Sequence, residues 1–292
     1  MNDGYPRPEA LVSADWLAEH LDDAEVRVLD GSFHLPGSGR DPRAEYAATR
    51  IPGARFFDID GICDRESPLP HMLPPADAFA VAVEALGIGG GDLVIAYDQP
   101  GSCAAARVWW SFRTFGHARA AVLDGGLAAW IEAGLPVTEA PPRIAASRFA
   151  ARFDPTRVRT AADVRAMLGD PAAQIVDARP AGRYAGRDPE PREAAKRGHV
   201  PSAASVPFAA LIDPARGGAW RPAAELRAAF TAAGVDPLRP ITAYCGSGVT
   251  ACTVAFAAYL LGGDAVAVYD GSWAEWGNLD DTPVVSGDGR GG

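Results

Sequence analysis

The amino-acid sequence repeats itself at a spacing of about half its length, and this internal duplication constrains the fold more than any other feature. Asp30 in VRVLDGSF corresponds to Asp177 in AQIVDARP, and matched positions lie 146 to 149 residues apart in the 292-residue chain. The other matched positions are Ser13 with Thr160, Pro52 with Pro201, Asp98 with Cys245, Asp124 with Asp270, and Trp130 with Trp276. These matches in one register indicate two domains of common ancestry.

Both halves alternate short apolar segments with helical patterns. Leu17 and Leu21 follow helical spacing behind a Ser13 cap. The apolar runs 93–97 and 241–244 each lead through a glycine-containing turn into a longer helical stretch. Because strands that alternate with helices form parallel sheets with crossover helices, we predict an α/β fold with two tandem domains, each a parallel sheet flanked by helices.

The domain boundaries follow from composition. Residues 135–157 are rich in Pro, Ala and Arg and show no sustained periodicity, which is typical of a connector. We predict a first domain over 1–140, a linker over 141–157, a second domain over 158–286 and a flexible tail over 287–292.

Net charge and hydropathy exclude several classes of partner. The chain has 27 basic and 37 acidic residues, a net charge of −10, which argues against binding to nucleic acid or to an anionic membrane surface. The longest nearly apolar run, 249–261, is too short to span a membrane. The amino terminus lacks the basic and apolar regions of a secretory signal, and the four cysteines form no CxxC pair. We therefore expect a cytoplasmic protein with reduced thiols.

Cofactor chemistry receives little support from the sequence. Lys196 is the only lysine and lies in a charged stretch, which disfavours a pyridoxal phosphate enzyme because that class needs a lysine in a desolvated pocket. The five histidines show no paired ligand spacing, and there is no phosphate-binding glycine loop. The sequence therefore predicts neither a metal nor an organic cofactor.

The duplication singles out Cys245 as a nucleophile. It follows an apolar strand and precedes a loop of small residues and a helix, where the first half has Asp98. Unpaired N–H groups and the positive end of a helix stabilise a thiolate in such a place. A free cysteine is more often a buried core thiol, and we retain that interpretation for Cys63, Cys103 and Cys252.

The strand, the loop from Cys245 to Thr250 and the following helix resemble the active loop of the rhodanese superfamily, in its 3-mercaptopyruvate sulfurtransferase branch. The segments GRDPRAEY, IPGARFFDID, RVWWSFRTFGH and GHVPSAASVPF extend this resemblance over nearly the whole chain. It implies two tandem rhodanese-like domains with the active cysteine in the second. It also implies an enzyme that moves sulfur from 3-mercaptopyruvate, through a persulfide on Cys245, to a thiol, thioredoxin or cyanide, and that releases pyruvate.

The residues after the cysteine separate related activities. A cysteine phosphatase or arsenate reductase with a similar loop needs an arginine six residues after the cysteine, where this chain has Ala251. Thiosulfate-preferring relatives carry basic side chains directly after the cysteine, whereas this chain has Gly246, Ser247 and Gly248. Two alternatives stay open: a thiosulfate:cyanide sulfurtransferase and a non-catalytic rhodanese-like binding module.

The resemblance also implies a set of substrate-binding residues. Arg183 and Arg192 match the arginines that bind the substrate in the family, and arginine forks suit the carboxylate and carbonyl of a 2-oxo acid. The loop residues expected to contact the substrate are Gly246, Gly248, Val249 and Thr250.

A proton relay is implied as well. Asp60, His71 and Ser247 match a proposed relay of the family, in which the serine hydroxyl moves a proton and the other two side chains orient it. Since Asp60 and His71 lie in the first half and Ser247 in the second, we expect the site to open at the domain junction.

Overall fold

The computed structural model describes residues 3–290, and its first half builds one five-stranded sheet. The elements are a 3-10 turn (Pro8–Ala10), β1 (Leu11–Val12), α1 (Ala14–His20), β2 (Val26–Asp30), α2 (Pro42–Ala48), β3 (Arg55–Phe56), α3 (Ala76–Ala85), β4 (Leu93–Tyr97), α4 (Ala105–Thr114), β5 (Ala120–Leu123) and α5 (Gly126–Glu132). As predicted, Ser13 caps α1, because its hydroxyl oxygen accepts the N–H of Trp16 at 3.1 Å.

The second half builds another five-stranded sheet and a short hairpin. Its strands are β6 (Val158–Arg159), β7 (Ile175–Asp177), β8 (Ala204–Ser205), β9 (Ile212–Asp213), β10 (Ala219–Trp220), β11 (Ile241–Tyr244) and β12 (Val266–Tyr269). Its helices are α6 (Ala161–Met167), α7 (Ala181–Tyr184), α8 (Ala223–Ala232), α9 (Ala251–Leu260) and α10 (Ser272–Trp276), with 3-10 turns at Pro155–Arg157, Phe208–Ala210 and Pro214–Arg216.

The two sheets have equivalent strand orders, β1-β5-β4-β2-β3 and β6-β12-β11-β7-β8, and all neighbouring strands in them are parallel. Matched residues pair in the same way: Asp30 lies opposite Tyr97 in the first sheet, and Asp177 lies opposite Tyr244 in the second. The predicted α/β fold with two tandem parallel-sheet domains is confirmed. Position 98 and position 245 therefore follow equivalent strands.

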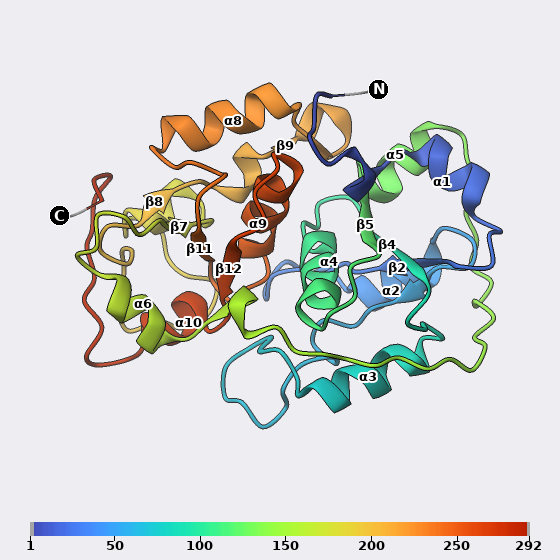
Figure 1. The fold of residues 1–292 in the computed structure, drawn as a ribbon, viewed down its shortest axis with the longest axis horizontal. Coiled ribbons are helices and arrows are strands. Elements are labelled where there is room, and N and C mark those ends of the chain that lie inside the picture. Colours follow the sequence, from blue (N-terminus) through green and yellow to red (C-terminus); the bar gives the residue numbers. More distant parts are fainter. Residues whose placement is uncertain (1–2, 291–292) are drawn as a thin grey trace.

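Both faces of each sheet are buried, as is typical of parallel sheets. In β4, Ile95 packs into a cluster with residues of α1 and α5, whereas Val94 faces a larger cluster. That larger cluster continues through α4 and α9 into the second sheet. Trp109 of α4 packs edge-on against Phe256 of α9, with ring centroids 4.8 Å apart. Figure 1 shows these two helices side by side at the centre, so the domains share one hydrophobic core.

The amino-terminal segment lies against the second domain, although its position in the chain placed it with the first. The hydroxyl of Tyr5 donates to the carbonyl of Arg221 at 2.7 Å, and the Arg7 guanidinium donates to the carbonyl of Gly262 at 3.0 Å. These contacts cross the domain junction and add to its packing.

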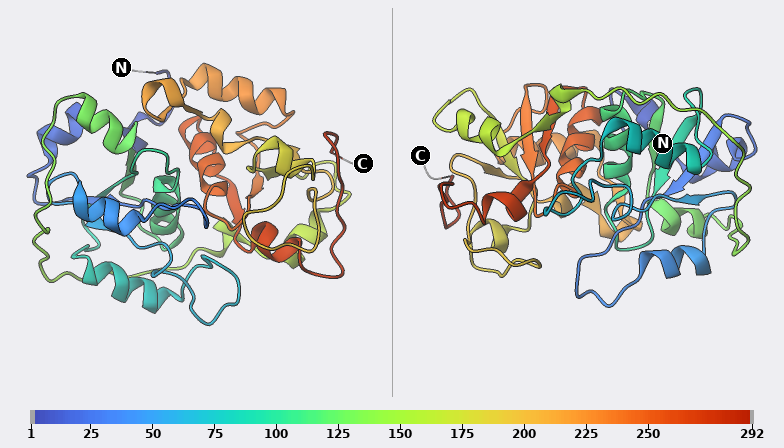
Figure 2. Two further views of the ribbon diagram at one scale, coloured as in Figure 1. Left: turned by 180° about the vertical axis from the view of Figure 1, so that it is seen from behind. Right: turned by 90° about the horizontal axis from the view of Figure 1, so that it is seen from below.

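The expected linker and tail are both held by the domains beside them. Residues 142–154 contain no helix or strand, yet Phe149 is buried among aromatic rings of the first domain. The carbonyl of Arg290 accepts the Ser202 N–H at 2.8 Å, and Gly287 donates to the carbonyl of Ala185 at 3.0 Å. The carboxyl-terminal segment runs along the outside of the second domain (Figure 2). The last two residues of the predicted tail, 291–292, lie outside the described residues.

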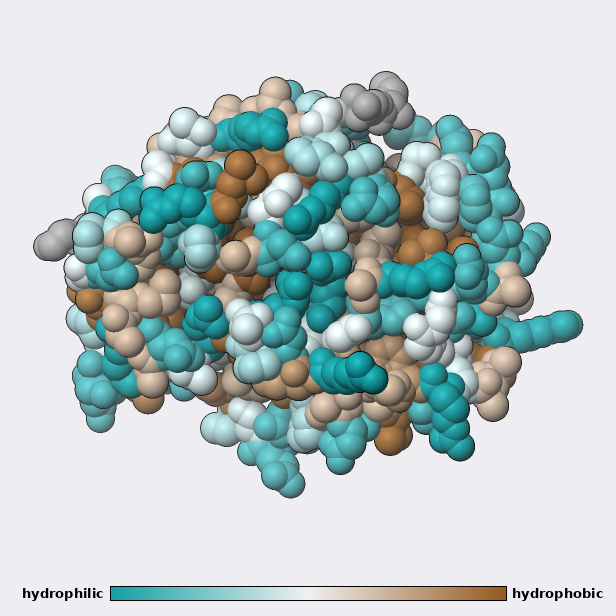
Figure 3. Space-filling view, in the orientation of Figure 1, coloured by the Kyte–Doolittle hydropathy of each residue, from teal (hydrophilic) through white to brown (hydrophobic). Residues whose placement is uncertain are grey.

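The surface is mixed in character. On the face drawn in Figure 3, hydrophilic residues predominate and hydrophobic residues form small separate groups. Among residues 3–290, no helix has the length and apolar character needed to cross a membrane.

Candidate active site

Cys245 occupies the turn between β11 and α9. It is buried, with 1% of its surface exposed, and its own N–H donates to the Ser272 hydroxyl at 3.2 Å. Within residues 3–290, the N–H groups of residues 246–250 donate no hydrogen bond. Unpaired amides beside a helix start attract negative charge, so this loop is suited to hold an anion on or near the Cys245 sulfur.

Two glycines give the loop its shape. Gly248 has a φ of +77°, and a Cβ at this position would lie 2.8 Å from Oδ1 of Asp270. At Gly246, a Cβ would lie 2.8 Å from Nη2 of Arg183. Glycine is therefore favoured at position 248 both by the positive φ and by the lack of room for a Cβ. At position 246, the missing Cβ lets an arginine approach the main chain.

Cys245 lines a cavity of about 180 Å³ between the domains. The lining residues of the first domain are Phe33, His34, Leu35, Gly101, Cys103 and Ala104. Those of the second domain include Arg183, Glu190, Arg192, Phe208, Gly246, Ser247, Val249, Thr250 and Trp273. Of the residues predicted from the sequence, Arg183, Arg192, Ser247 and three of the four loop residues therefore share a cavity with Cys245, whereas Gly248 does not line it.

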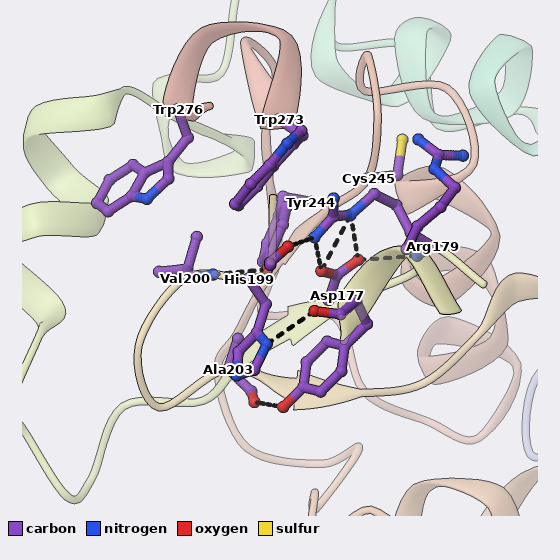
Figure 4. Close-up of polar contacts among 12 residues, drawn as sticks. Asp177, Arg179, His199, Val200, Ala203, Tyr244, Cys245, Trp273 and Trp276 are labelled. Atoms are coloured by element: carbon purple, nitrogen blue, oxygen red, sulfur yellow. Dashed lines mark hydrogen bonds and ion pairs between the residues drawn. The ribbon is translucent and has the colours of Figure 1, made fainter. Parts of the chain in front are cut away.

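Arg183 is oriented by residues that the sequence analysis missed. Its Nε donates to Oε2 of Glu190 at 2.8 Å, and its Nη2 donates to the same oxygen. The other oxygen of Glu190 accepts Nη1 of the buried Arg179 at 2.6 Å, and Arg179 donates to Asp177 at 2.6 Å. Figure 4 shows Arg179 between Asp177 and the ring of Trp273, beside Cys245. This chain of ion pairs fixes the Arg183 guanidinium at the cavity.

The duplication carries a signal for Arg179 that the sequence analysis did not use. The equivalent position in the first half is Ser32, whose N–H and hydroxyl both donate to Asp30. An arginine in place of this serine is therefore specific to the half that contains Cys245.

Asp60 and His71 lie together, and they meet Arg192. Nδ1 of His71 lies 3.2 Å from Oδ1 of Asp60, and Nε2 lies 2.9 Å from Nη2 of Arg192. Burial lowers the pKa of His71, so the ring is neutral near neutral pH. Because Arg192 can only donate, Nε2 accepts and the ring proton lies on Nδ1, facing Asp60.

Ser247 is buried in the same cavity, but its hydroxyl forms no hydrogen bond with His71 or with any other group in residues 3–290. The structure thus joins Asp60, His71 and Arg192 in one chain and places Ser247 beside Cys245. A relay through all three predicted members stays a prediction, because His71 directs its free nitrogen at Arg192 instead of Ser247.

The equivalent loop of the first domain is filled by its own carboxylate. Asp98 accepts the N–H groups of Ala104 and Ala105 at 2.9 to 3.1 Å and the Ser102 hydroxyl at 2.9 Å. Burial raises the pKa of Asp98 to about 7. In the first domain, amides at the equivalent end of the loop thus donate to Asp98. The amides beside Cys245 have no such partner in the described part of the chain.

The other thiols are placed differently. Cys252 is buried in α9 and donates to the carbonyl of Gly248 at 3.3 Å, and burial raises its pKa. Burial raises the pKa of Cys103 to about 12 and also raises that of Cys63. These three thiols are therefore protonated at neutral pH. Cys252 is a buried core thiol as predicted, but Cys63 and Cys103 are only partly buried, so the prediction of a core thiol is wrong for those two.

Comparison with known proteins agrees with this architecture. Residues 13–133 and 160–279 each match the Rhodanese-like domain, so the chain belongs to the rhodanese family. It is 42% identical over 288 residues to the human 3-mercaptopyruvate sulfurtransferase, covering 97% of this chain and 96% of that protein. It is 43% identical over 275 residues to the enzyme of the same name from Escherichia coli K12, covering 94% of this chain and 97% of that protein.

A solved structure gives the same result. The crystal structure of SseA from Escherichia coli, described as a 3-mercaptopyruvate sulfotransferase, superposes with a TM-score of 0.82 at 41% identity. The match covers 91% of this chain and 99% of SseA. The similarity therefore includes both domains and the junction between them.

Proposed function

We propose that this protein is a sulfurtransferase that takes sulfur from 3-mercaptopyruvate, carries it as a persulfide on Cys245 and releases pyruvate. One observation carries the proposal: Cys245, with its unpaired loop amides, shares a cavity with the guanidinium groups of Arg183 and Arg192. The human and Escherichia coli relatives bear the name of this activity. A nucleophile beside two carboxylate-binding groups suits a thiol-bearing 2-oxo acid.

Donor binding follows from the two arginines. The carboxylate and the 2-oxo oxygen of 3-mercaptopyruvate lie in one plane and accept hydrogen bonds from guanidinium forks. Arg183 is pre-oriented by Glu190, and Arg192 is pre-oriented by His71. The donor is therefore held with its thiol directed at Cys245.

The sulfur-transfer step needs no oxidant or reductant besides the enzyme and 3-mercaptopyruvate. The Cys245 thiolate attacks the donor sulfur, a sulfur–sulfur bond forms, and the carbon–sulfur bond breaks with its electron pair moving into the enolate of pyruvate. The arginines stabilise the enolate charge, and a proton from the Ser247 hydroxyl or from water converts the enolate to pyruvate. The loop amides then surround the persulfide.

The outer sulfur is passed on in a second step. Cyanide, a small thiol or a thioredoxin-type dithiol attacks the outer sulfur of the persulfide and restores the Cys245 thiolate. The free state of Cys63, Cys103, Cys245 and Cys252 suits a reducing compartment such as the cytoplasm.

A donor comparison tests the proposal. Pyruvate release from 3-mercaptopyruvate is measured beside thiocyanate formation from thiosulfate and cyanide, with Cys245→Ser, Arg183→Ala and a Cys63→Ser control. We expect 3-mercaptopyruvate to be the better donor, because residues 246–250 contain no cation to bind a dianion. Arg183→Ala should raise KM for 3-mercaptopyruvate and lower kcat/KM about 10- to 100-fold, the cost of one charge-assisted contact. A strong preference for thiosulfate, or activity in Cys245→Ser, would overturn the proposal.

A further inference from the structure

A buried arginine of the first domain reaches into the second domain behind Cys245. Arg107 lies on α4 and is 3% exposed. Its Nη1 donates to Oδ1 of Asp270 at 2.5 Å, and its Nη2 donates to the carbonyl oxygen of His71 at 2.5 Å. Burying a guanidinium is unfavourable unless its donors are paired with good geometry, so these partners are held in fixed places.

The same ion pair contacts both loops of the candidate site. Nη1 of Arg107 lies 3.3 Å from the carbonyl oxygen of Gly248, in the cysteine loop. Oδ2 of Asp270, which follows β12 and is 1% exposed, accepts the N–H of Leu73 at 2.8 Å. Arg107 and Asp270 therefore bind the His71 loop of one domain and the Cys245 loop of the other.

Both loops have an unfavourable or crowded backbone at the residues that contact Arg107 and Asp270. His71 has a φ of +61°, in the left-handed region that favours glycine. Its carbonyl and the N–H two residues later are held by Arg107 and Asp270. At Gly248, a Cβ would lie 3.1 Å from Nη1 of Arg107. The positions of His71 and of the cysteine loop thus depend on one ion pair.

The duplication shows that the fold itself does not require this arginine. Asp124 is the counterpart of Asp270, and it accepts the N–H of Trp220 at 2.8 Å, just as Asp270 accepts that of Leu73. Because α4 and α9 begin at positions 105 and 251, the counterpart of Arg107 is Thr253, whose hydroxyl has no partner within residues 3–290. Each domain thus has an aspartate that accepts a backbone N–H of the other domain. Of the two, only Asp270, in the domain that contains Cys245, is also paired with a buried arginine among the described residues.

We propose that Arg107 and Asp270 are positioning residues for sulfur transfer, which hold His71, and through it Arg192, in register with Cys245 across the domain junction. This inference rests on the proposed function. Arg107 acts through the backbone of His71 and Gly248 and does not line the cavity. Arginine suits this role because its planar guanidinium holds donors on separate nitrogens in a fixed geometry, whereas lysine offers a single nitrogen on a flexible stem.

A double-mutant cycle tests the role. The rate constant for pyruvate release in a single turnover, at saturating 3-mercaptopyruvate, is measured for wild type, Arg107→Lys, His71→Gln and the double variant. We expect Arg107→Lys to lower this rate constant on the order of 100-fold, because displacement of reacting groups by about 1 Å has that effect. In the His71→Gln background, the same substitution should lower the rate constant far less, because both act through one group.

A matched control separates positioning from stability. Asp124→Asn removes charge from the mirror contact, so it should shift thermal unfolding while the single-turnover rate constant stays that of wild type. If Arg107→Lys does not fold, Asp270→Asn takes its place in the cycle, since it keeps the side-chain volume and an acceptor for Leu73.

The outcomes distinguish this inference from the proposed function. Wild type that forms no persulfide contradicts the proposed function itself. A second outcome contradicts the positioning role alone. In it, wild type forms persulfide, and the fold-losses in the rate constant from Arg107→Lys and His71→Gln multiply in the double variant. A wild-type rate constant in Arg107→Lys or in His71→Gln contradicts it equally.

Discussion

At the scale of residues, the two halves differ at the turn that holds the proposed nucleophile. The same turn after the same strand holds Asp98 in one domain and Cys245 in the other. The Asp98 carboxylate accepts amides of its own loop, whereas the amides beside Cys245 stay unpaired within the part of the chain described. The first domain thus carries its own carboxyl group where the second domain is suited to carry a thiolate or a persulfide.

This comparison predicts a pH dependence of stability. Burial raises the folded-state pKa of Asp98 to about 7, above its ordinary value near 4, so the folded protein binds this proton more tightly than the unfolded chain. Stability from this group should therefore fall as pH rises from about 4 to about 7. Asp98→Asn should remove that part of the slope and make the protein more stable than wild type at pH 8, by up to a few kcal/mol. Denaturant unfolding of both proteins from pH 4 to 8 measures this, and parallel curves would contradict it.

The meeting of Cys245, Arg183 and Arg192 at one cavity could be predicted from the sequence because each lies in a motif of consecutive residues. Arg107 and Glu190 could not be found in this way. The Arg107 partners lie 36 to 163 residues away and in both domains, and residue spacing carries no information on how two domains dock. For the same reason, the sequence did not predict that His71 meets Arg192.

At the scale of elements, the unit of β11, cysteine loop and α9 decides the geometry of the site. The duplication predicted this unit well, because the strand orders and the strand register of the two sheets are equivalent. Gly248 is its most constrained residue, since a positive φ and two close side chains meet there. The unit tolerates little change at that position.

Gly248→Ala should therefore destabilise the protein and impair sulfur transfer. A Cβ at φ +77° costs roughly 1–2 kcal/mol, and its approach to Asp270 adds to this. Gly169→Ala is the matched control, because Gly169 has a φ of +81° and no atom within 4 Å of an added Cβ. Urea unfolding and pyruvate release are compared for the two variants. Equal losses of stability, together with unchanged turnover in both, would contradict the close contact.

At the scale of the whole molecule, the two domains are joined by one continuous hydrophobic cluster. The largest hydrophobic cluster includes residues of both sheets and of α3, α4, α8 and α9. The cavity that contains Cys245 is completed by residues 33–35 of the first domain. The first domain is therefore required for the site even though it has no nucleophile.

Trp109→Ala tests whether the two domains unfold together. Trp109 is 2% exposed and packs on both Phe256 and Tyr259 of the other domain. Its removal should destabilise the protein by about 3–5 kcal/mol and lower a single thermal transition that both domains share. Calorimetry measures the transition, and an exposed aromatic-to-alanine change such as Phe153→Ala serves as the control. Two separate transitions in wild type would show that the domains unfold independently.

Intact-protein mass spectrometry after a short incubation with 3-mercaptopyruvate tests the central claim most directly, with peptide mapping to locate any added sulfur. We predict that the wild-type chain gains one sulfur atom on Cys245, that the mass returns to its starting value on addition of cyanide, and that Cys245→Ser gains none. Added sulfur on Cys63, Cys103 or Cys252 with Cys245 unmodified, or no added sulfur while pyruvate is still released, would contradict the account.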